Sequence, residues 1–411
     1  MNILFIHQNF PGQFKSLAPA LVAAGHRVHA FRINGSDLPK VKVHRYTLGR
    51  NSSRGIHPWA ADFESKMIRG EACGRAANQL KETGFMPDVI VANPSWGESL
   101  FLKDVWPAAR MLNLFEFFYA AHDLDCNFDP EFSVTSWETD ARLRAKNAPL
   151  LMALQGMDAG WCPMHFQKNT LPVAYRDQVS VIFDGIDTKL VKPDPQAALT
   201  LNGRTFNASD EVITFVNRNL EPMRGYHIFM RALPEILRQR PNAIVLIVGG
   251  DGVSYGAAPP NGKSWKQIFL DEVKDQLDLS RVLFLDRIPY HDYLKLLQVS
   301  SCHVYLTYPF VLGWSCLEAM SAGCLVVGSS TAPVQEVIQH EENGLLVDFF
   351  DVEALSKTVI DCLSRPAQYA HLRLNARKTV VNSYDLYSIC LPQQMRLVEG
   401  EGRIKRSLKA E

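Results

Sequence analysis

Short apolar runs alternate with amphipathic stretches along most of the chain. In the first half, these runs predict strands at residues 3–7, 28–31, 88–92, 111–117, 160–162 and 179–183. Helical patterns lie between most of them, and such alternation is typical of βαβ units with a buried parallel sheet. The pattern therefore predicts an α/β fold.

A second series of the same kind predicts strands at residues 212–216, 244–248, 282–285, 304–307, 325–328 and 345–347. Pro193, Pro195 and the polar segment 201–210 precede it and are typical of a linker. We therefore expect two Rossmann-like domains, residues 1–198 and 199–382, whose parallel sheets face a central cleft. The C-terminal segment 383–411 is helical in composition and is expected to pack back on the first domain.

Composition narrows the classes of partner. Of the 411 residues, 43 are Lys or Arg and 43 are Asp or Glu, so no excess charge favours nucleic acid. The eight cysteines form no C-x-x-C pair and show no zinc spacing, which indicates reduced thiols. No apolar stretch approaches the ~20 residues of a membrane span, and the N-terminal run is too short for a signal peptide. We expect a cytoplasmic protein.

The chain ends in a basic tail of four cations: Arg403, Lys405, Arg406 and Lys409. A solvated end is the first interpretation of such a tail. Peripheral contact with an anionic lipid surface, at the inner face of a membrane, is the alternative.

Segment 310–327 holds the most informative pattern. Gly313 precedes a predicted helix, and unpaired N–H groups at a helix start suit a diphosphate. Glu318 follows within that helix among apolar residues. A buried carboxylate needs a partner, and a ribose diol supplies two donors at once. Pairing with a core arginine, or capping of another element, is the alternative for Glu318.

The run LEAMSAGCLVV followed by PVQEVIQHEENGLLV resembles the C-terminal signature of the family 4 retaining glycosyltransferases, and the same order of elements covers nearly the whole chain. The resemblance implies the GT-B fold, with Glu318 on the nucleotide ribose. The family's first acidic position is Phe310 here, eight residues before Glu318, which leaves the donor sugar open. The donor-binding candidates of this segment are Phe310, Leu312, Gly313, Trp314, Ser315 and Glu318.

The segment NRNLEPMRG places Arg218 and Arg224 between a predicted strand and a predicted helix. Two guanidinium groups beside a glycine turn can clamp a pyrophosphate and stabilise the leaving group without a metal. The segment resembles the family's G-R-x-x-x-x-K-G element, with Arg in place of Lys and one residue inserted. Both arginines are therefore catalytic candidates, and a surface loop with unrelated arginines is the alternative.

Two further turns are candidates for contact with the donor. Gly12 follows the first strand at the carboxyl edge of its sheet, where a glycine lets backbone approach a ligand, although it can equally be a simple turn. The segment LDRIPYHDY resembles the family's nucleobase loop. The resemblance implies that main-chain groups at Arg287 and Ile288 contact the base.

Relatives often carry a catalytic histidine after a strand of the N-terminal domain, and His122 is the candidate here. Asp123 could orient its imidazole, while Glu116 on the preceding strand is a rival. A helix-capping or surface His-Asp pair is the alternative. The turn at residues 93–98 also follows a strand, so Trp96 and Glu98 could hold an acceptor sugar or form a plain loop. The acceptor-binding candidates are Trp96, Glu98 and Glu116.

The resemblance implies a hexosyltransferase-type enzyme of class EC 2.4. It would transfer a sugar with retention from a UDP- or GDP-sugar to a saccharide or lipid-linked acceptor in surface polysaccharide or glycoconjugate synthesis. Neither a metal nor another cofactor is expected. Two alternatives remain at this stage: a sugar-nucleotide-binding protein without transferase activity, which Phe310 suggests, and a GT-B-shaped epimerase or phosphorylase.

Overall fold

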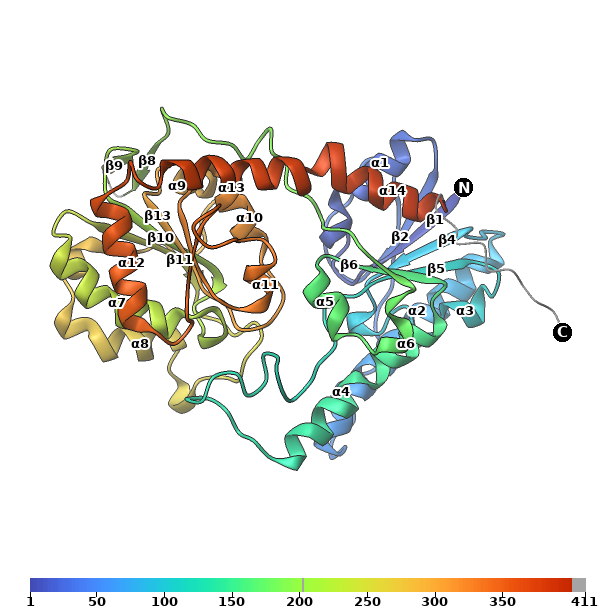
Figure 1. Cartoon of the computed structure of the whole chain (residues 1–411). Helices are drawn as coiled ribbons and strands as arrows, with labels where there is room; N and C mark the ends of the chain where they lie inside the picture. The colour runs from blue at the N-terminus through green and yellow to red at the C-terminus, as the bar shows by residue number, and fades with distance from the viewer. Residues whose placement is uncertain (202, 401–411) are drawn as a thin grey trace. The chain divides into compact units, whose positions relative to one another are not determined.

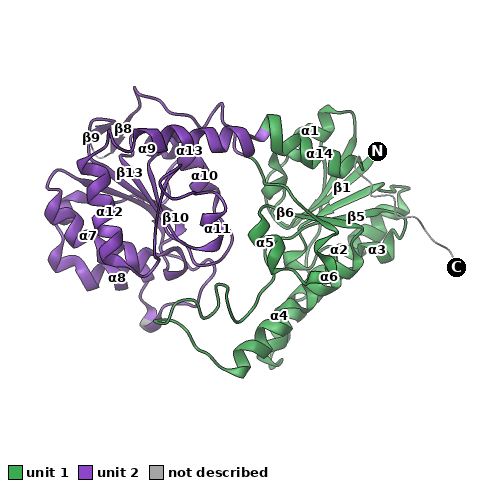
Figure 2. Cartoon of the chain, viewed as in Figure 1, with its two compact units in different colours: residues 1–185, 387–411 green, residues 186–386 purple. Residues whose placement is uncertain are grey.

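The computed structural model describes residues 1–201 and 203–400, which form two compact α/β units (Figure 1; Figure 2). Unit 1 comprises residues 1–185 and 387–411, and unit 2 comprises residues 186–386. The basic tail at residues 403–409 lies outside the described residues, so its two interpretations stay predictions.

Unit 1 is built on a seven-stranded parallel sheet in the order β3-β2-β1-β4-β5-β6-β7. Its strands are β1 (Asn2–Ile6), β2 (Arg27–Arg32), β3 (Lys42–Arg45), β4 (Val89–Ala92), β5 (Arg110–Leu114), β6 (Ala159–Cys162) and β7 (Val179–Val181). The sequence predicted all of them except β3. That strand lies at the sheet edge and has the sequence KVHR, so no apolar run marks it.

The helices of unit 1 are η1 (Gly12–Lys15), α1 (Leu17–Ala23), η2 (Pro58–Ala60), α2 (Ala61–Glu82), η3 (Pro94–Trp96), α3 (Leu102–Val105), α4 (Trp137–Gly156), α5 (His165–Thr170), α6 (Val173–Arg176) and α14 (Leu391–Glu399). A π-helical turn, Leu386–Cys390, precedes α14, which packs against α1. Arg110 Nη1 donates to the Leu397 carbonyl at 2.8 Å, and His26 Nε2 lies 2.9 Å from Glu399 Oε1. These contacts attach the last described helix to unit 1.

Unit 2 contains a six-stranded parallel sheet in the order β12-β11-β10-β13-β14-β15. Its strands are β10 (Val212–Asn219), β11 (Ile244–Gly250), β12 (Val282–Phe284), β13 (Cys302–Tyr305), β14 (Val326–Ser329) and β15 (Leu345–Val347). Its helices are η4 (Pro222–Arg224), α7 (Tyr226–Gln239), η5 (Pro260–Gly262), α8 (Trp265–Val273), η6 (Lys274–Gln276), η7 (Leu279–Arg281), α9 (Tyr290–Gln298), α10 (Trp314–Ala322), α11 (Ala332–Gln335), α12 (Val352–Ser364) and α13 (Ala370–Ser383).

The segment expected to be a linker belongs to unit 2. It contains an antiparallel hairpin of β8 (Ala198–Leu201) and β9 (Arg204–Asn207). The units divide between residues 185 and 186, earlier than the division after residue 198 that the sequence suggested. The reason is a set of contacts with α13 and the residues after it: Arg377 donates to the carbonyls of Thr188 and Val191, and Ile186 bridges to Asp385.

The core of unit 2 lies between its sheet and its helices, and α7 shows how the sequence produces it. Apolar residues recur at helical spacing on this helix, so one face is buried almost completely. Phe229 on that face stacks on Phe215 of β10, with ring centroids 4.5 Å apart. This packing fixes α7, and with it the turn η4 that precedes it.

Two glycines of unit 2 provide a matched test of this packing. Gly225 and Gly262 both have φ +68°, where an L-residue is strained by ~1–2 kcal/mol. A Cβ at Gly225 would also lie 2.3 Å from Leu306 Cβ, whereas one at Gly262 would have nothing within 4 Å. We expect Gly262→Ala to lower the free energy of unfolding by ~1–2 kcal/mol and Gly225→Ala by ~2–5 kcal/mol. Urea unfolding followed by circular dichroism measures both losses, and equal losses would contradict the close packing at Gly225.

Candidate functional site

A pocket of about 440 Å³ opens in unit 2 at the carboxyl ends of β10 and β11 and beside the loop after β12. Ligands of open parallel sheets bind at this edge. The lining residues are Asn217, Arg218, Val248, Asp286, Arg287, Ile288, Tyr290 and Tyr293. Three candidates from the sequence, Arg218, Arg287 and Ile288, therefore come together here, while the two tyrosines of α9 were not foreseen.

Glu318 of α10 is 9% exposed and is held by the same two tyrosines. The Tyr290 hydroxyl donates to Oε1 at 2.6 Å, and the Tyr293 hydroxyl donates to Oε2 at 2.8 Å. Burial, together with the charge of Glu318, raises the pKa of both phenols well above the usual range, so they stay protonated donors at neutral pH. Each carboxylate oxygen can accept a second hydrogen bond, so Glu318 retains capacity for a diol.

Arg224 is fixed in a buried position next to this pocket region. Its Nη1 donates to Thr307 Oγ1 at 2.8 Å and to the Val311 carbonyl at 3.0 Å. The centre of its guanidinium lies 5.2 Å from the Tyr255 ring, and that of Arg218 lies 5.9 Å from the same ring. The structure thus brings the two predicted arginines to one aromatic side chain.

Phe310, which the resemblance placed at the family's first acidic position, packs against this group. Its ring lies 5.0 Å from the Tyr255 ring and 5.7 Å from the guanidinium carbon of Arg224. An aromatic face attracts a cation. Phe310 therefore supports Arg224 from the side, through ring contact instead of an ion pair.

The start of α10 differs in part from the sequence expectation. Unpaired N–H groups were expected at the helix start, but the N–H of Gly313, directly before the helix, donates to the Tyr305 hydroxyl at 2.7 Å, because the end of β13 brings that phenol beneath the helix start. Trp314 and Ser315 are half-buried in the first turn, whereas Leu312 is buried. The first turn of α10 is thus anchored to the sheet by Gly313.

In unit 1, a group of polar residues gathers at the carboxyl ends of β1, β4 and β5. Glu116, two residues after β5, accepts from Gln13 Nε2 at 2.7 Å and from Asn93 Nδ2 at 3.2 Å. Gln13 in turn is 2.8 Å from His7 Nε2. Gly12 has φ +49°, and a Cβ there would come within 2.4 Å of the His7 ring, so the turn requires glycine. Sequence reasoning missed His7, although a polar residue directly after the first strand was the signal.

Two other candidates of unit 1 lie elsewhere. Glu98 is only 1% exposed, and its Oε1 is 3.7 Å from Arg69 Nη1 on α2. Burial raises the pKa of its carboxyl. The turn after η3 packs onto α2, where a Cβ at Gly70 would lie 2.9 Å from the Gly97 carbonyl. The acceptor contact expected of Glu98 stays a prediction.

His122 lies in an exposed loop, with 67% of its side chain accessible. Its Nε2 is 4.0 Å from Asp140 Oδ2, at the start of α4, instead of being oriented by Asp123. Asp123 has φ +62°, so the chain turns between the two neighbours. Glu116, and not His122, is therefore the candidate that is connected by hydrogen bonds to the end of β1.

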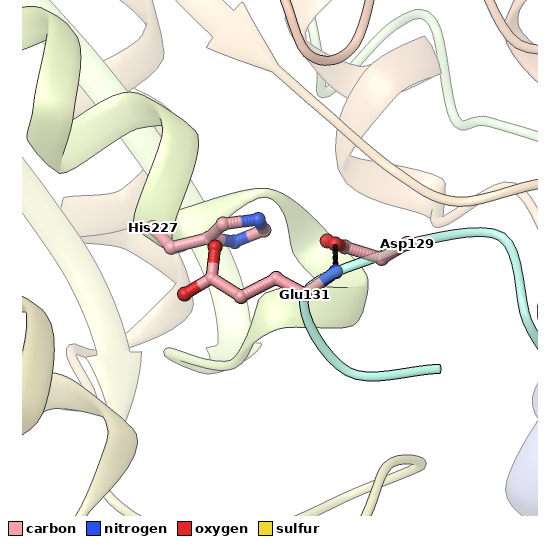
Figure 3. Close-up of side chains that lie close together, drawn as sticks. All are labelled: Asp129, Glu131 and His227. Carbon is pink, nitrogen blue, oxygen red and sulfur yellow. Dashed lines mark hydrogen bonds between the residues drawn. The ribbon is translucent and has the colours of Figure 1, made fainter. Parts of the chain in front are cut away.

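Figure 3 draws three further side chains that can ligate a metal: Asp129, Glu131 and His227. In unit 1, the Glu131 N–H donates to Asp129 Oδ1 at 3.0 Å, which closes a turn of the loop before α4. His227 belongs to α7 of unit 2. The expectation that the protein needs no metal stays a prediction.

No helix among residues 1–201 and 203–400 combines the length and the apolar character that a membrane span requires.

The fold has known counterparts. Sucrose-phosphate synthase from Thermosynechococcus elongatus superposes with a TM-score of 0.73 at 21% identity, over 97% of this chain and 98% of that one. Anabaena HepE, solved in complex with UDP and glucose, superposes with a TM-score of 0.66 at 17% identity, over 97% and 99% of the two chains. The two parallel-sheet, Rossmann-like units therefore form a GT-B fold.

Residues 23–191 match the family described as Glycosyl transferase family 4 group, and residues 202–379 match Glycosyl transferases group 1. The two matches together cover most of the chain, which belongs to the family 4 glycosyltransferases. This confirms the resemblance drawn from the LEAMSAGCLVV segment.

Curated relatives match over a shorter range. A GDP-mannose-dependent phosphatidylinositol monomannoside mannosyltransferase of Mycolicibacterium smegmatis is 26% identical over 203 residues, which is 49% of this chain and 51% of the relative. An uncharacterized glycosyltransferase of Methanocaldococcus jannaschii is 30% identical over 213 residues, 51% of this chain and 50% of the relative. The chain spans about half the length of the curated relatives it matches.

Proposed function

We propose that this protein is a metal-independent, retaining glycosyltransferase that moves a sugar from a UDP- or GDP-sugar to a saccharide or glycolipid acceptor in surface glycoconjugate synthesis. The proposal rests on the Glu318 carboxylate. It accepts hydrogen bonds from Tyr290 and Tyr293, and both tyrosines line the pocket of unit 2. A buried acceptor pair beside a pocket with two arginines suits a ribose next to a pyrophosphate.

Each part of the donor has a matching group in unit 2. The base would lie against the main chain at Arg287 and Ile288, and the ribose hydroxyls would donate to Glu318. Arg218 and Arg224 would hold the pyrophosphate, with help from the first turn of α10 at Trp314 and Ser315, which Gly313 anchors to the sheet. Phe310 and Leu312, both buried, would shape the space for the sugar. In unit 1, Gly12 would give close backbone approach to the donor.

Names of similar proteins support a nucleotide sugar without choosing the base. The Mycolicibacterium smegmatis relative is named as GDP-mannose-dependent, whereas the HepE structure holds UDP. We therefore propose both donor classes and leave the choice to experiment.

The arginines suit transfer on the face of the sugar from which the phosphate leaves. The bond between the anomeric carbon and the phosphate oxygen breaks, the bond to the acceptor oxygen forms, and the acceptor proton passes to the departing phosphate. Negative charge grows on that phosphate, and the guanidinium groups of Arg218 and Arg224 would stabilise it. The guanidinium of Arg224 is already held in place by Thr307 and the Val311 carbonyl. Trp96 and Glu116 of unit 1 are the acceptor-side groups in this proposal.

Phe310 favours one alternative, a protein that binds sugar nucleotides without transferring the sugar. Proton NMR of a mixture of enzyme, α-linked donor and a panel of methyl and octyl glycosides separates the two functions. We expect free nucleotide diphosphate to accumulate together with a new α-anomeric signal, at matched rates. Binding of a donor with no such product would favour the alternative, and a β-linked product would contradict retention.

A further inference from the structure

We infer that Glu116, Gln13 and Asn93 form a site for two adjacent hydroxyls of a neutral sugar, with Trp96 beside it and His7 as the residue that positions it. The inference deepens the proposed function and rests on it, because it names the chemistry of the acceptor end that unit 1 would hold. All of these residues belong to unit 1 and to the edge where its strands end.

The direction of each hydrogen bond follows from a backbone donor. The N–H of Asn9 lies 3.0 Å from His7 Nδ1 and can only donate, so Nδ1 is the acceptor and Nε2 carries the proton. His7 Nε2–H then donates to Gln13 Oε1 at 2.8 Å. The Gln13 amide is thereby oriented with its NH₂ group toward Glu116, where it donates at 2.7 Å.

The second amide is oriented in the same way. Asn93 is completely buried, and its Oδ1 accepts the backbone N–H of Ser95 at 3.0 Å. Its NH₂ group therefore faces Glu116 Oε2 at 3.2 Å. Gln167 Nε2 donates to the backbone carbonyl of Glu116 at 2.5 Å and fixes the main chain as well. Glu116 is a half-buried carboxylate held by two directed donors.

His7 is a rigid and neutral end of this chain of hydrogen bonds. Burial lowers its pKa, against the smaller opposing effect of Gln13, so the imidazole is uncharged at neutral pH. Its ring lies edge-on to Trp96 at 4.8 Å and to Phe14 at 5.9 Å, and Gly12 leaves room for it. A protonated His7 could not accept from Asn9, so the neutral form is the one that sets the Gln13 amide.

The chemistry of the site selects its ligand. The two amides take one acceptor position on each oxygen of Glu116, which leaves further positions that suit a vicinal diol. The half-buried Trp96 indole offers an apolar surface of the kind that packs on the C–H face of a pyranose. The side-chain donors to Glu116 in this group are neutral amides, so the negative charge of the carboxylate would repel a phosphate placed here. A neutral hexose end of the acceptor fits these conditions.

Saturation-transfer NMR of the full-length protein with methyl α-glucoside, methyl α-mannoside and methyl α-galactoside tests the site. We expect at least one glycoside to bind, Glu116→Gln to weaken it by about tenfold or more, and glucose 6-phosphate placed at the same concentration to compete less well. Donor affinity in unit 2, measured by calorimetry on the same variant, should stay within about threefold. No binding of any glycoside, or equal affinity in Glu116→Gln, would overturn the inference.

A pair of His7 variants tests the positioning role. His7→Phe keeps a ring but lacks the donor, whereas Gln in His7→Gln can place an amide N–H where Nε2 lies. We expect His7→Phe to raise the KM for the acceptor about fivefold or more at nearly constant donor KM. In His7→Gln, the acceptor KM should return most of the way to that of the unchanged protein. Equal effects of the two variants would overturn the role of His7. If the protein transferred sugar and the rate did not depend on Glu116, only this site would be refuted. If glycoside binding depended on Glu116 but the protein transferred no sugar, only the proposed function would be refuted.

Discussion

Replacing Arg224 by methionine is expected to slow sugar transfer by roughly 100- to 1000-fold, because one fixed donor to the charge of the departing phosphate is lost. The donor should still bind with a smaller loss, since that charge is largest in the transition state. Pre-steady-state measurement of turnover beside calorimetric donor affinity separates the two effects. Methionine keeps an unbranched apolar side chain beside the rings of Tyr255 and Phe310, which lie 5.2 and 5.7 Å from the guanidinium carbon of Arg224.

The controls for this variant use other cations. Arg224→Lys keeps the charge, but its single nitrogen cannot both reach Thr307 and the Val311 carbonyl, as Nη1 does, and replace the second guanidinium nitrogen as a donor to a phosphate, so we expect an intermediate rate. Arg238→Met changes an exposed arginine on α7 that is paired with Glu235, and it should leave the rate unchanged. Loss of the Thr307 contact can cost ~1–3 kcal/mol of stability, so thermal unfolding must confirm that each variant is folded at the assay temperature. An equal loss of donor affinity and turnover in Arg224→Met would contradict a role in the transition state.

Apolar runs were sufficient to predict the two parallel sheets. Buried strands such as β4 and β11 are almost entirely apolar, so they are visible in the sequence, whereas β3 carries three polar residues at a sheet edge. The hairpin β8–β9 was hidden for a related reason, since each of its two short strands has only one buried position. Strand burial, and not strand formation, is what the pattern reports.

The sequence predicted the site residues that one segment contains. It did not predict the residues that tertiary contacts bring to that segment. Glu318 stands out as a lone acid in an apolar helix, but Tyr290 and Tyr293 come from α9, 28 and 25 residues earlier in the chain. The link between Gln13 and Glu116 spans 103 residues, and neither residue signals the other. The burial of Glu98 was not visible in the sequence, because a polar residue after a strand suggests an exposed loop, whereas two glycines let this turn pack against α2.

Glu318→Gln is the second change for which we expect a large effect. An amide has only one acceptor oxygen, so it cannot serve two phenols and two ribose hydroxyls as the carboxylate can. We expect donor affinity to fall by about 10- to 100-fold. Glu235→Gln, on the exposed side of α7, is the matched control and should bind the donor as the unchanged protein does.

Calorimetric titration of UDP-glucose and GDP-mannose into the unchanged protein and Glu318→Gln is the most direct test of the claim that unit 2 binds a nucleotide sugar. Thermal unfolding should first show that Glu318→Gln stays folded, because the phenol of Tyr293 is buried. The account predicts measurable binding of at least one donor to the unchanged protein and the stated loss in the variant. Binding of neither donor, or unchanged affinity in Glu318→Gln, would contradict it.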